Sequence, residues 1–394
     1  MSLRLPVYLD HNATTPVDPR VFEAIAPYFC EHFGNAASRG HSFGWTANQA
    51  VDKARRQVAQ LIGAQPDSII FTSGATESDN LAIKGVAEGL RAKGRHIITQ
   101  TTEHKAVIDP CKRLETDGFE VTWLAVDRFG RVDPDDLRRA IRPDTVLVSI
   151  MYANNEIGTI QAMRDIGAVC RERNVLLHSD ATQAVGKIPV DVETDRIDLL
   201  SLTGHKIYGP KGCGALFVGS AQACGSLRPL IDGGGQERGY RSGTLNVPGI
   251  VGLGMACEIA HKSLRDDATR LRELRDRLEQ AILQHLGNVR VNGCPDQRLP
   301  QTSSLTFADL NGMTEAMTIE DVAVSAGSAC QSANPEPSHV LRAIGVDPQL
   351  ARNTVRFSLG RSTTREEVDF AIERTVQCVT GLRDLAAMCA AKPD

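Results

Sequence analysis

Apolar strand-like runs alternate with helix-forming segments from about residue 65 to residue 220, and this alternation constrains the fold more than any other feature. A chain that alternates apolar strands with helices folds into a largely parallel sheet covered on both faces. Two of the intervening helical segments span residues 77–93 and 163–173. The predicted strands read "SIIFTS", "RHIITQ", "FEVTWLAV", "TVLVSIMYAN", "NVLLHSD", "DLLSLT" and "CGALFVG".

The pattern changes near residue 260, where a long charged segment begins. Shorter strand signals follow in "VRVNG", "TSSLTF" and "TVRFSLG", and in the last helical segment Thr364 and Glu367 have capping-box spacing. A chain of 394 residues is too long for one small core, so we predict a large domain, 16–260, and a smaller one formed by 1–15 and 261–394. One helical stripe of the charged segment holds Leu264, Leu271, Leu274, Leu278 and Ile282.

The composition argues against several classes of protein. With 44 basic and 48 acidic residues, the net charge of −4 gives no reason to expect a nucleic acid or a membrane as partner. No apolar run reaches the length of a membrane span, and the first residues lack the apolar core of a signal peptide. The ten cysteines form no C-x-x-C pair. We therefore expect a cytoplasmic protein with free thiols and no bound metal.

A lysine follows one of the predicted strands in "SLTGHKIYGPKGCGALFVG". Lys206 stands directly after the strand and before a Gly-Pro-Lys-Gly turn. Ligands bind at the carboxyl edge of an open α/β sheet, and a lysine at that edge can form a Schiff base with a carbonyl ligand. An ordinary surface lysine in a hairpin loop is the alternative, and spacing alone favours it, because lysine side chains are usually exposed.

Two other strand ends carry groups that suit one ligand. Asp180 ends the strand in "LLHSDATQAVGK", with Gln183 one turn later. A carboxylate there can pair with the protonated pyridine nitrogen of pyridoxal phosphate (PLP), although a helix N-cap is the alternative. The strand in "FTSGATESDNLAIKG" runs into a helix, whose first backbone N–H groups suit a phosphate.

Nine short motifs, spread from Tyr8 to the final helix, carry more information together than singly. In chain order they read "YLDHNATTP", "TSGATESDNLAI", "TEHKAV", "YANNEIGT", "HSDATQAVGK", "SLTGHKIYGPKGCGAL", "GGGQERGYRSGTLN", "GSACQSANPEPSHVLRAIG" and "TVRFSLGR". Together they resemble the cysteine desulfurases, in the NifS/IscS-like group of the class V aminotransferases. The resemblance implies the α/β PLP fold type I, with a mainly parallel seven-stranded sheet, a smaller α+β domain and a homodimer. It also implies PLP as cofactor, L-cysteine as substrate and a sulfur-acceptor protein as partner.

The resemblance assigns the cofactor site residue by residue. Lys206 would form the internal aldimine, Asp180 would pair with the pyridine nitrogen, and Gln183 would contact the ring oxygen. His104 would stack on the ring and shuttle protons, and Asn155 would contact the ring oxygen and the substrate. The phosphate would be bound by Ala75, Thr76, Thr203 and His205, and by Thr244 from across the dimer interface.

The same resemblance assigns the substrate site. Arg356 would bind the substrate carboxylate in two-point fashion, whereas an exposed strand arginine in a surface ion pair is the alternative. Asn12 would line the cleft. Cys330 lies in "SAGSACQSANPEPSHV", among residues that neither fill a core nor continue a helix. It would take the sulfur of cysteine as a persulfide and leave L-alanine; a buried, inert cysteine is the alternative.

Two other functions stay open at this point. A selenocysteine lyase or another class V aminotransferase-like PLP enzyme would share most motifs, and Cys330 discriminates only partly. A nucleotide-binding or scaffold protein without PLP chemistry would leave Lys206, Asp180 and Arg356 without a joint explanation. The acceptor is not identified either, because iron–sulfur cluster assembly, tRNA or DNA thiolation and cofactor synthesis all use this chemistry.

Overall fold

The computed structural model describes residues 3–310, 319–326 and 337–390, and its largest element is a seven-stranded sheet of order β2-β8-β7-β6-β5-β3-β4. Strand β8 pairs antiparallel with both neighbours, and the other pairs are parallel. The predicted α/β fold with a mainly parallel sheet is therefore confirmed. The strands are β2 (Ile69–Thr72), β3 (His96–Gln100), β4 (Glu120–Leu124), β5 (Thr145–Ser149), β6 (Leu176–Asp180), β7 (Leu199–Thr203) and β8 (Gly214–Val218).

Helices cover both faces of this sheet. Successive residues of a strand point to opposite faces, and the side chains on each face pack with helices in a separate apolar layer. In β2, Ile69 and Phe71 join one layer, whereas Ile70 joins the other. Since both faces are buried, the strands are apolar at consecutive positions. The first layer includes side chains of α3 (Ser42–Leu61), α7 (Met163–Glu172) and α9 (Val247–His285), and the second includes side chains of α4 (Ala75–Gly89), α5 (Lys105–Thr116) and α8 (Ala221–Ser226).

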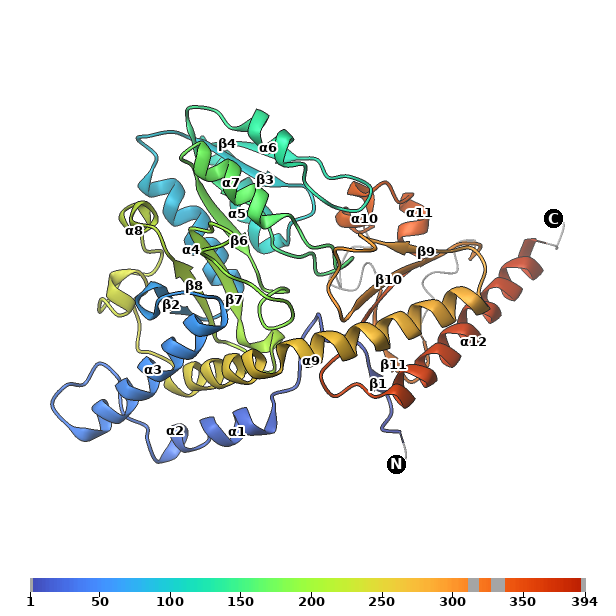
Figure 1. The fold of residues 1–394 in the computed structure, drawn as a ribbon, viewed down its shortest axis with the longest axis horizontal. Helices are drawn as coiled ribbons and strands as arrows, with labels where there is room; N and C mark the ends of the chain where they lie inside the picture. Colours follow the sequence, from blue (N-terminus) through green and yellow to red (C-terminus); the bar gives the residue numbers. More distant parts are fainter. Residues whose placement is uncertain (1–2, 311–318, 327–336, 391–394) are drawn as a thin grey trace.

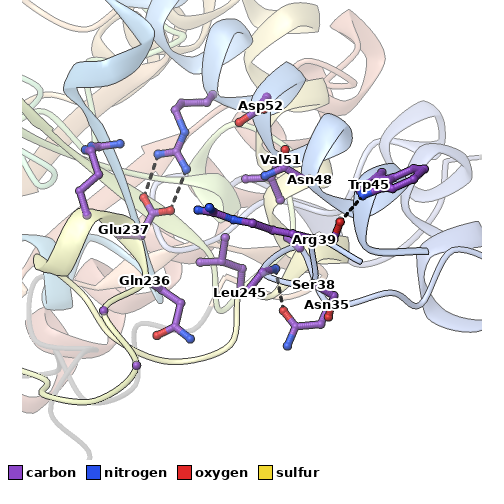
Figure 2. A pocket seen from close by; sticks show the side chains of 16 residues that line it. Asn35, Ser38, Arg39, Trp45, Asn48, Val51, Asp52, Gln236, Glu237 and Leu245 are labelled. Carbon is purple, nitrogen blue, oxygen red and sulfur yellow. Dashed lines mark hydrogen bonds and ion pairs between the residues drawn. The ribbon is translucent and has the colours of Figure 1, made fainter. Parts of the chain in front are cut away.

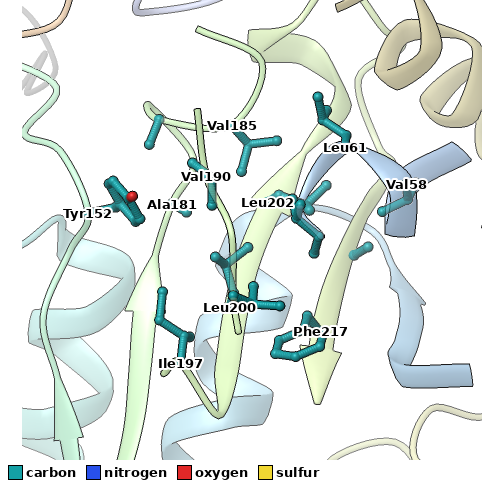
Figure 3. Packing of buried hydrophobic residues seen from close by; sticks show 14 of the residues in the cluster. Val58, Leu61, Tyr152, Ala181, Val185, Val190, Ile197, Leu200, Leu202 and Phe217 are labelled. Atoms are coloured by element: carbon teal, nitrogen blue, oxygen red, sulfur yellow. The ribbon is translucent and has the colours of Figure 1, made fainter. Parts of the chain in front are cut away.

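Figure 3 shows the first layer beside β7 and β8. Leu200 and Leu202 of β7 and Phe217 of β8 belong to the same cluster as Val58 and Leu61 of α3. Leu200 is fully buried, so its truncation to alanine would cost about 2–5 kcal/mol of unfolding free energy. This packing holds the strand ends that carry Asp180 and Thr203 in fixed positions.

A second, four-stranded sheet of order β12-β13-β10-β9 lies beside the C-terminal half of α9 (Figure 1). Its core joins Phe307 and Phe357 of the sheet to Leu278 of α9. Leu9 belongs to the same core, and β1 pairs with β11, so the N-terminal segment packs against this part. The elements are β1 (Val7–Tyr8), β9 (Val289–Asn292), β10 (Thr302–Phe307), β11 (Val322–Ala323), β12 (Ser325–Ala326), β13 (Thr354–Ser358) and α12 (Arg365–Ala390).

Helix α9 is continuous across the predicted domain boundary at residue 260. It has 39 residues and runs from the large sheet to the second sheet (Figure 1). Ala260 joins the apolar layer of the large sheet, whereas Leu271 joins the second core. On the predicted stripe Leu271, Leu278 and Ile282 are buried. The division into 16–260 and the remainder stays a prediction, because one helix spans it.

The remaining described helices are short and lie at the edges of the two parts. They are α1 (Pro19–Ile25), α2 (Pro27–Cys30), α6 (Pro134–Ala140), α10 (His339–Ala343) and α11 (Pro348–Ala351). At the start of α12 the capping box is confirmed, since Glu367 N donates to Thr364 Oγ1 at 3.2 Å and Thr364 N donates to Glu367 Oε2 at 2.9 Å. Among the described helices, none is long and apolar enough to cross a membrane.

Candidate active site

A cavity of about 620 Å³ opens at the carboxyl ends of β6 and β7 and is closed on one side by β13. It brings together residues that are far apart in the sequence. Of the predicted site residues, Thr244 is exposed and does not line it, and Cys330 lies outside the described residues. The predicted residues that line it are Asn12, Ala75, Thr76, His104, Asn155, Asp180, Gln183, Thr203, His205, Lys206 and Arg356.

Lys206 ends a short 3₁₀ turn, Gly204–Lys206, directly after β7. Its Nζ donates to the backbone carbonyl oxygens of Asn12 and Ala13, each at 2.5 Å. These two contacts hold the amine at the wall of the cavity. The lysine therefore lies at the carboxyl edge of the sheet, as predicted, and not in an exposed hairpin loop.

Asp180 and Gln183 form the adjoining wall. Asp180 is the last residue of β6, is only 5% exposed, and accepts the N–H of Thr182 at 2.9 Å. Gln183 Nε2 donates to the carbonyl oxygen of Asn12 at 2.9 Å, and its Oε1 accepts from Lys187 Nζ at 2.5 Å. Burial lowers the pKa of Lys187 well below its usual range, and Lys206 lowers it further.

Helix α4 begins at the cavity, and no side chain of the described residues caps its N-terminus. Its N-cap is Gly74, whose φ of 153° favours glycine. The backbone N–H groups of Ala75 and Thr76 in the first turn have no partner within the helix, and they suit an anion. The N-terminus of this 15-residue helix thus forms part of the cavity wall and presents backbone donors there.

The two residues that flank Gly204, Thr203 and His205, line the same cavity. Thr203 ends β7 and is buried, with its Oγ1 donating to the carbonyl oxygen of Cys213 at 3.2 Å. His205 Nδ1 lies 3.1 Å from Thr14 Oγ1. Burial, with help from Lys206, lowers the pKa of His205 to about 4. His205 is therefore neutral near pH 7 and can offer one ring N–H to an anion.

His104 is the N-cap of α5, and its geometry fixes its tautomer. Its Nδ1 accepts the backbone N–H of Ala106 at 3.1 Å. A neutral imidazole carries one proton, so that proton lies on Nε2. The sequence left this tautomer open. The ring thus lines the cavity with Nε2 as its donor.

Arg356 reaches the cavity from β13 and is 7% exposed, so it is not a surface ion-pair residue. Its Nη1 donates to the carbonyl oxygen of Asn155 at 3.0 Å, and its Nη2 donates to Asp10 Oδ1 at 2.7 Å.

Asn12 ties the two parts of the chain together, because its Nδ2 donates to Thr302 Oγ1 at 2.9 Å and to Asn155 O at 3.2 Å.

Comparisons with known proteins agree with this geometry. The aminotransferase class-V family model matches residues 7–370. A relative named cysteine desulfurase IscS, from Anaeromyxobacter dehalogenans (strain 2CP-C), is 52% identical over 386 residues, which cover 98% of this chain and 95% of the relative. The chain belongs to the class-V aminotransferase family, among its cysteine desulfurases.

Two solved structures of the same family resemble the chain in shape. One titled NifS-like protein is 39% identical, with a TM-score of 0.86, and the match covers 95% of this chain and 99% of that one. Another, titled SspA in complex with cysteine, is 39% identical with a TM-score of 0.79. The match covers 89% of this chain and 98% of that one. Class-V aminotransferases use PLP, and the lysine, aspartate and uncapped helix of this cavity fit that group.

Two buried carboxyl groups beside the desulfurase cavity were not predicted. Burial raises the pKa of both Asp79 and Glu103 well above the usual range, and the charge of Asp180 raises both further. His178 Nε2 lies 3.5 Å from Asp79 Oδ1, and burial lowers the pKa of His178 to about 4. Their only sequence signal is that Asp79, Glu103 and His178 stand inside motifs quoted for their neighbours.

A second cavity, of about 710 Å³, lies between α3 and the glycine-rich segment and contains neither Lys206 nor Arg356 (Figure 2). In it Glu237 accepts two hydrogen bonds from Arg55 of α3, at 2.7 and 2.8 Å, and one from the N–H of Phe71 at 2.8 Å. This buried ion pair anchors the segment "GGGQERGYRSGT" to the large sheet. The segment is thus tied down in its middle, and Thr244 at its end is exposed.

Proposed function

We propose that this chain is a PLP-dependent cysteine desulfurase that converts L-cysteine to L-alanine and stores the sulfur as a persulfide on Cys330. The observation that carries the proposal is that one cavity joins Lys206, Asp180 and Arg356. In the reaction the C–S bond of the substrate breaks and an S–S bond forms at Cys330. The carbon keeps the electron pair and takes a proton, so one thiol and one cysteine give one persulfide and one alanine.

The large-sheet wall would hold the cofactor. Lys206 Nζ would bond to it covalently, and the Asp180 carboxylate would face the pyridine nitrogen. The first turn of α4, with Thr203 and His205, would bind the phosphate. When bound, PLP supplies an electron sink that makes the Cα proton of the substrate acidic and its C–S bond breakable.

Other residues would position the substrate and move protons. Arg356 would bind the carboxylate, since a guanidinium matches it in two-point fashion. Asn155 and Asn12 would hold that subsite in place through their contacts with Arg356 and with each other. Lys206 Nζ would take the Cα proton, and His104 would exchange protons with the substrate through Nε2.

The described residues on either side of the Cys330 segment lie close to the cavity. Ser325 pairs with Arg356 across β12 and β13. On the other side His339 Nε2 lies 2.9 Å from the carbonyl oxygen of Glu103, the residue before His104. Ser338 Oγ donates to Glu156 Oε2 at 2.5 Å, next to Asn155. This placement of the flanks supports Cys330 as the thiol that meets the substrate.

We further propose that two copies form the active enzyme. Thr244 is exposed and absent from its own cavity, which leaves it available to the cavity of a second copy. Large aromatic side chains between residues 22 and 45 face solvent, and exposed apolar side chains of this size favour an interface. These side chains, each at least 50% exposed, are Phe22, Phe29, Phe33, Phe43 and Trp45.

We place the enzyme in a reducing compartment such as the cytoplasm, because its chemistry needs a free thiol. The nine cysteines of the described residues are also free thiols. The product would be passed to a sulfur-acceptor protein. The relatives named IscS support iron–sulfur cluster assembly as the pathway.

The decisive experiment is incubation of the PLP-loaded protein with L-cysteine, followed by alanine measurement and mass-spectrometric mapping of persulfide. We expect alanine in step with persulfide on Cys330, and Cys330→Ser should bind cysteine without turnover. Cys389→Ser, an exposed thiol on α12, is the control and should be fully active. Persulfide on another cysteine would reassign the nucleophile. A protein that gains no visible absorbance with PLP would refute the function.

A further inference from the structure

Arg356 already binds a carboxylate that belongs to the chain itself. Its Nη2 donates to Asp10 Oδ1 at 2.7 Å, in an ion pair whose side chains are 8% and 20% exposed. Asp10 is held there by its backbone, which bridges to Ser358 of β13 and accepts the N–H of Ala13 at 3.0 Å. These contacts fix the main chain of Asp10 beside β13 independently of the ion pair.

Arg356 uses one donor of each terminal nitrogen for contacts within the chain. A guanidinium has five N–H donors, one on Nε and two on each of Nη1 and Nη2. Nη1 is directed at the carbonyl oxygen of Asn155 and Nη2 at Asp10. Nε has no hydrogen-bond partner among the residues that the structure describes, and it is shielded from solvent. Each terminal nitrogen carries a second N–H, so a ligand in the cavity can reach Arg356 at Nη1 and Nη2, directly beside Asn155 O and the Asp10 carboxylate.

We infer that Asp10 is the resting counter-ion of Arg356, and that a substrate carboxylate binds by displacing or weakening this ion pair. The inference rests on the proposed function, in which Arg356 receives that carboxylate. The binding free energy of the carboxylate is then the gain from its own ion pair with Arg356 less the loss from the weakened Asp10 pair. Asp10 is a specificity-determining residue in this sense, because it sets how much a carboxylate adds to binding.

This arrangement separates amino acids from other small anions. An unpaired, desolvated arginine would attract any anion that enters the cavity. An arginine paired with Asp10 is neutralised, so a free anion gains little. An amino acid bound at Lys206 presents its carboxylate at high effective concentration, and it can compete with Asp10. Selectivity for a tethered carboxylate follows from the pair and not from Arg356 alone.

The test compares two ligands that differ only at the carboxylate, L-alanine and L-alaninamide, on the PLP-loaded protein. Binding is measured by calorimetry and by the absorbance change of bound PLP. In Asp10→Asn we expect L-alanine to bind about fivefold more tightly, the equivalent of one partly exposed ion pair, with no change for L-alaninamide. An unchanged or weaker affinity for L-alanine would overturn the inference.

A matched control separates competition from structural damage. Arg298 and Glu279 form a similarly buried pair at 3.0 Å, 4% and 14% exposed, and neither residue lines the cavity. Glu279→Gln should lower the melting temperature as Asp10→Asn does, yet leave both ligand affinities unchanged. If Glu279→Gln also tightens L-alanine binding, the gain does not come from the cavity and the inference fails.

Two more variants keep the proposal falsifiable. Asp10→Glu keeps the charge, so it should not tighten L-alanine binding; tightening would refute competition, even if Asp10→Asn does not fold. Arg356→Gln should weaken L-alanine but not L-alaninamide. If Arg356→Gln changes neither, the carboxylate subsite itself is wrong, and this part of the proposed function fails with the inference. If it weakens L-alanine while Asp10→Asn changes nothing, only the inference fails.

Discussion

The two walls of the active-site cavity are built in different ways. The large-sheet wall presents Asp180 and Lys206 at the ends of two paired strands, so their spacing follows from one strand register. The facing wall depends on side-chain contacts between distant segments, such as Asn12 with Thr302 and Asp10 with Arg356. The cofactor wall is therefore set by backbone geometry, whereas the substrate wall is set by a few polar side chains that single substitutions can disturb.

The largest effect is expected on the large-sheet wall. Lys206→Ala removes the amine that would bond to PLP, so the visible absorbance of the protein should disappear and alanine formation should fall by at least about 10³-fold. Lys93→Ala, an exposed lysine, is the control and should be unaffected. Retained absorbance and turnover in Lys206→Ala would show that another group holds the cofactor.

On the substrate wall we expect a change in affinity with the cofactor still bound. Arg356→Lys loses the planar fork, so KM for L-cysteine should rise about 10-fold to 100-fold while PLP absorbance stays the same. Steady-state kinetics and spectra check both parts. Arg272→Lys, on an exposed position of α9, should change neither value. Loss of PLP from Arg356→Lys would mean that the two walls are not separable.

Asn12 contacts both walls of the cavity. Its truncation should lower stability and weaken substrate binding, each by a moderate amount. Asn12→Ala removes the side-chain bonds to Thr302 and Asn155 but keeps the backbone carbonyl that Lys206 and Gln183 contact. The unfolding free energy should fall by about 1–3 kcal/mol, with a raised KM and normal PLP absorbance. Urea unfolding measures the first. An exposed control, Gln377→Ala on α12, should cost far less.

The smallest effect is expected from Asp79, which is buried in the large-sheet part. Its pKa is raised, so between the ordinary value near 4 and the raised value the folded chain binds a proton that the unfolded chain has lost. Stability from this group therefore falls as pH rises, and Asp79→Asn should raise the melting temperature at pH 8 by about 2 °C, with a smaller gain at pH 5.

The contrast for that prediction is Asp127, whose backbone and Arg131 hydrogen bonds lower its pKa despite partial burial. Its contribution is present at neutral pH and is lost as pH falls below the ordinary value. Asp127→Asn should therefore lower the melting temperature at pH 8. A melting curve for Asp79→Asn that moves in the same direction would contradict the assignment of a neutral buried carboxyl.

The large-sheet wall was predictable from sequence because its rules are local. Strands buried on both faces are apolar throughout, so the strand ends at Asp180 and Thr203 could be placed at the ligand edge. The family resemblance, and not the local pattern, selected Asp180 and Lys206 as site residues. The side-chain contacts around the site residues could not be predicted from the sequence. The contact of Asp10 with Arg356, or of Lys187 with Gln183, depends on how separate segments pack, and no local pattern encodes it.

The single helix α9 makes the number of residues between the two parts a geometric parameter. Its 39 residues span roughly 58 Å, and each added residue would rotate the second sheet about the helix axis by about 100°. An insertion at exposed Lys262 would leave the apolar layer of the large sheet intact. It would move β13, which carries Arg356, away from its position across the cavity from the end of β7. Length variation between residues 247 and 285 should therefore be tolerated far less than in a surface loop, even where the inserted side chains touch nothing.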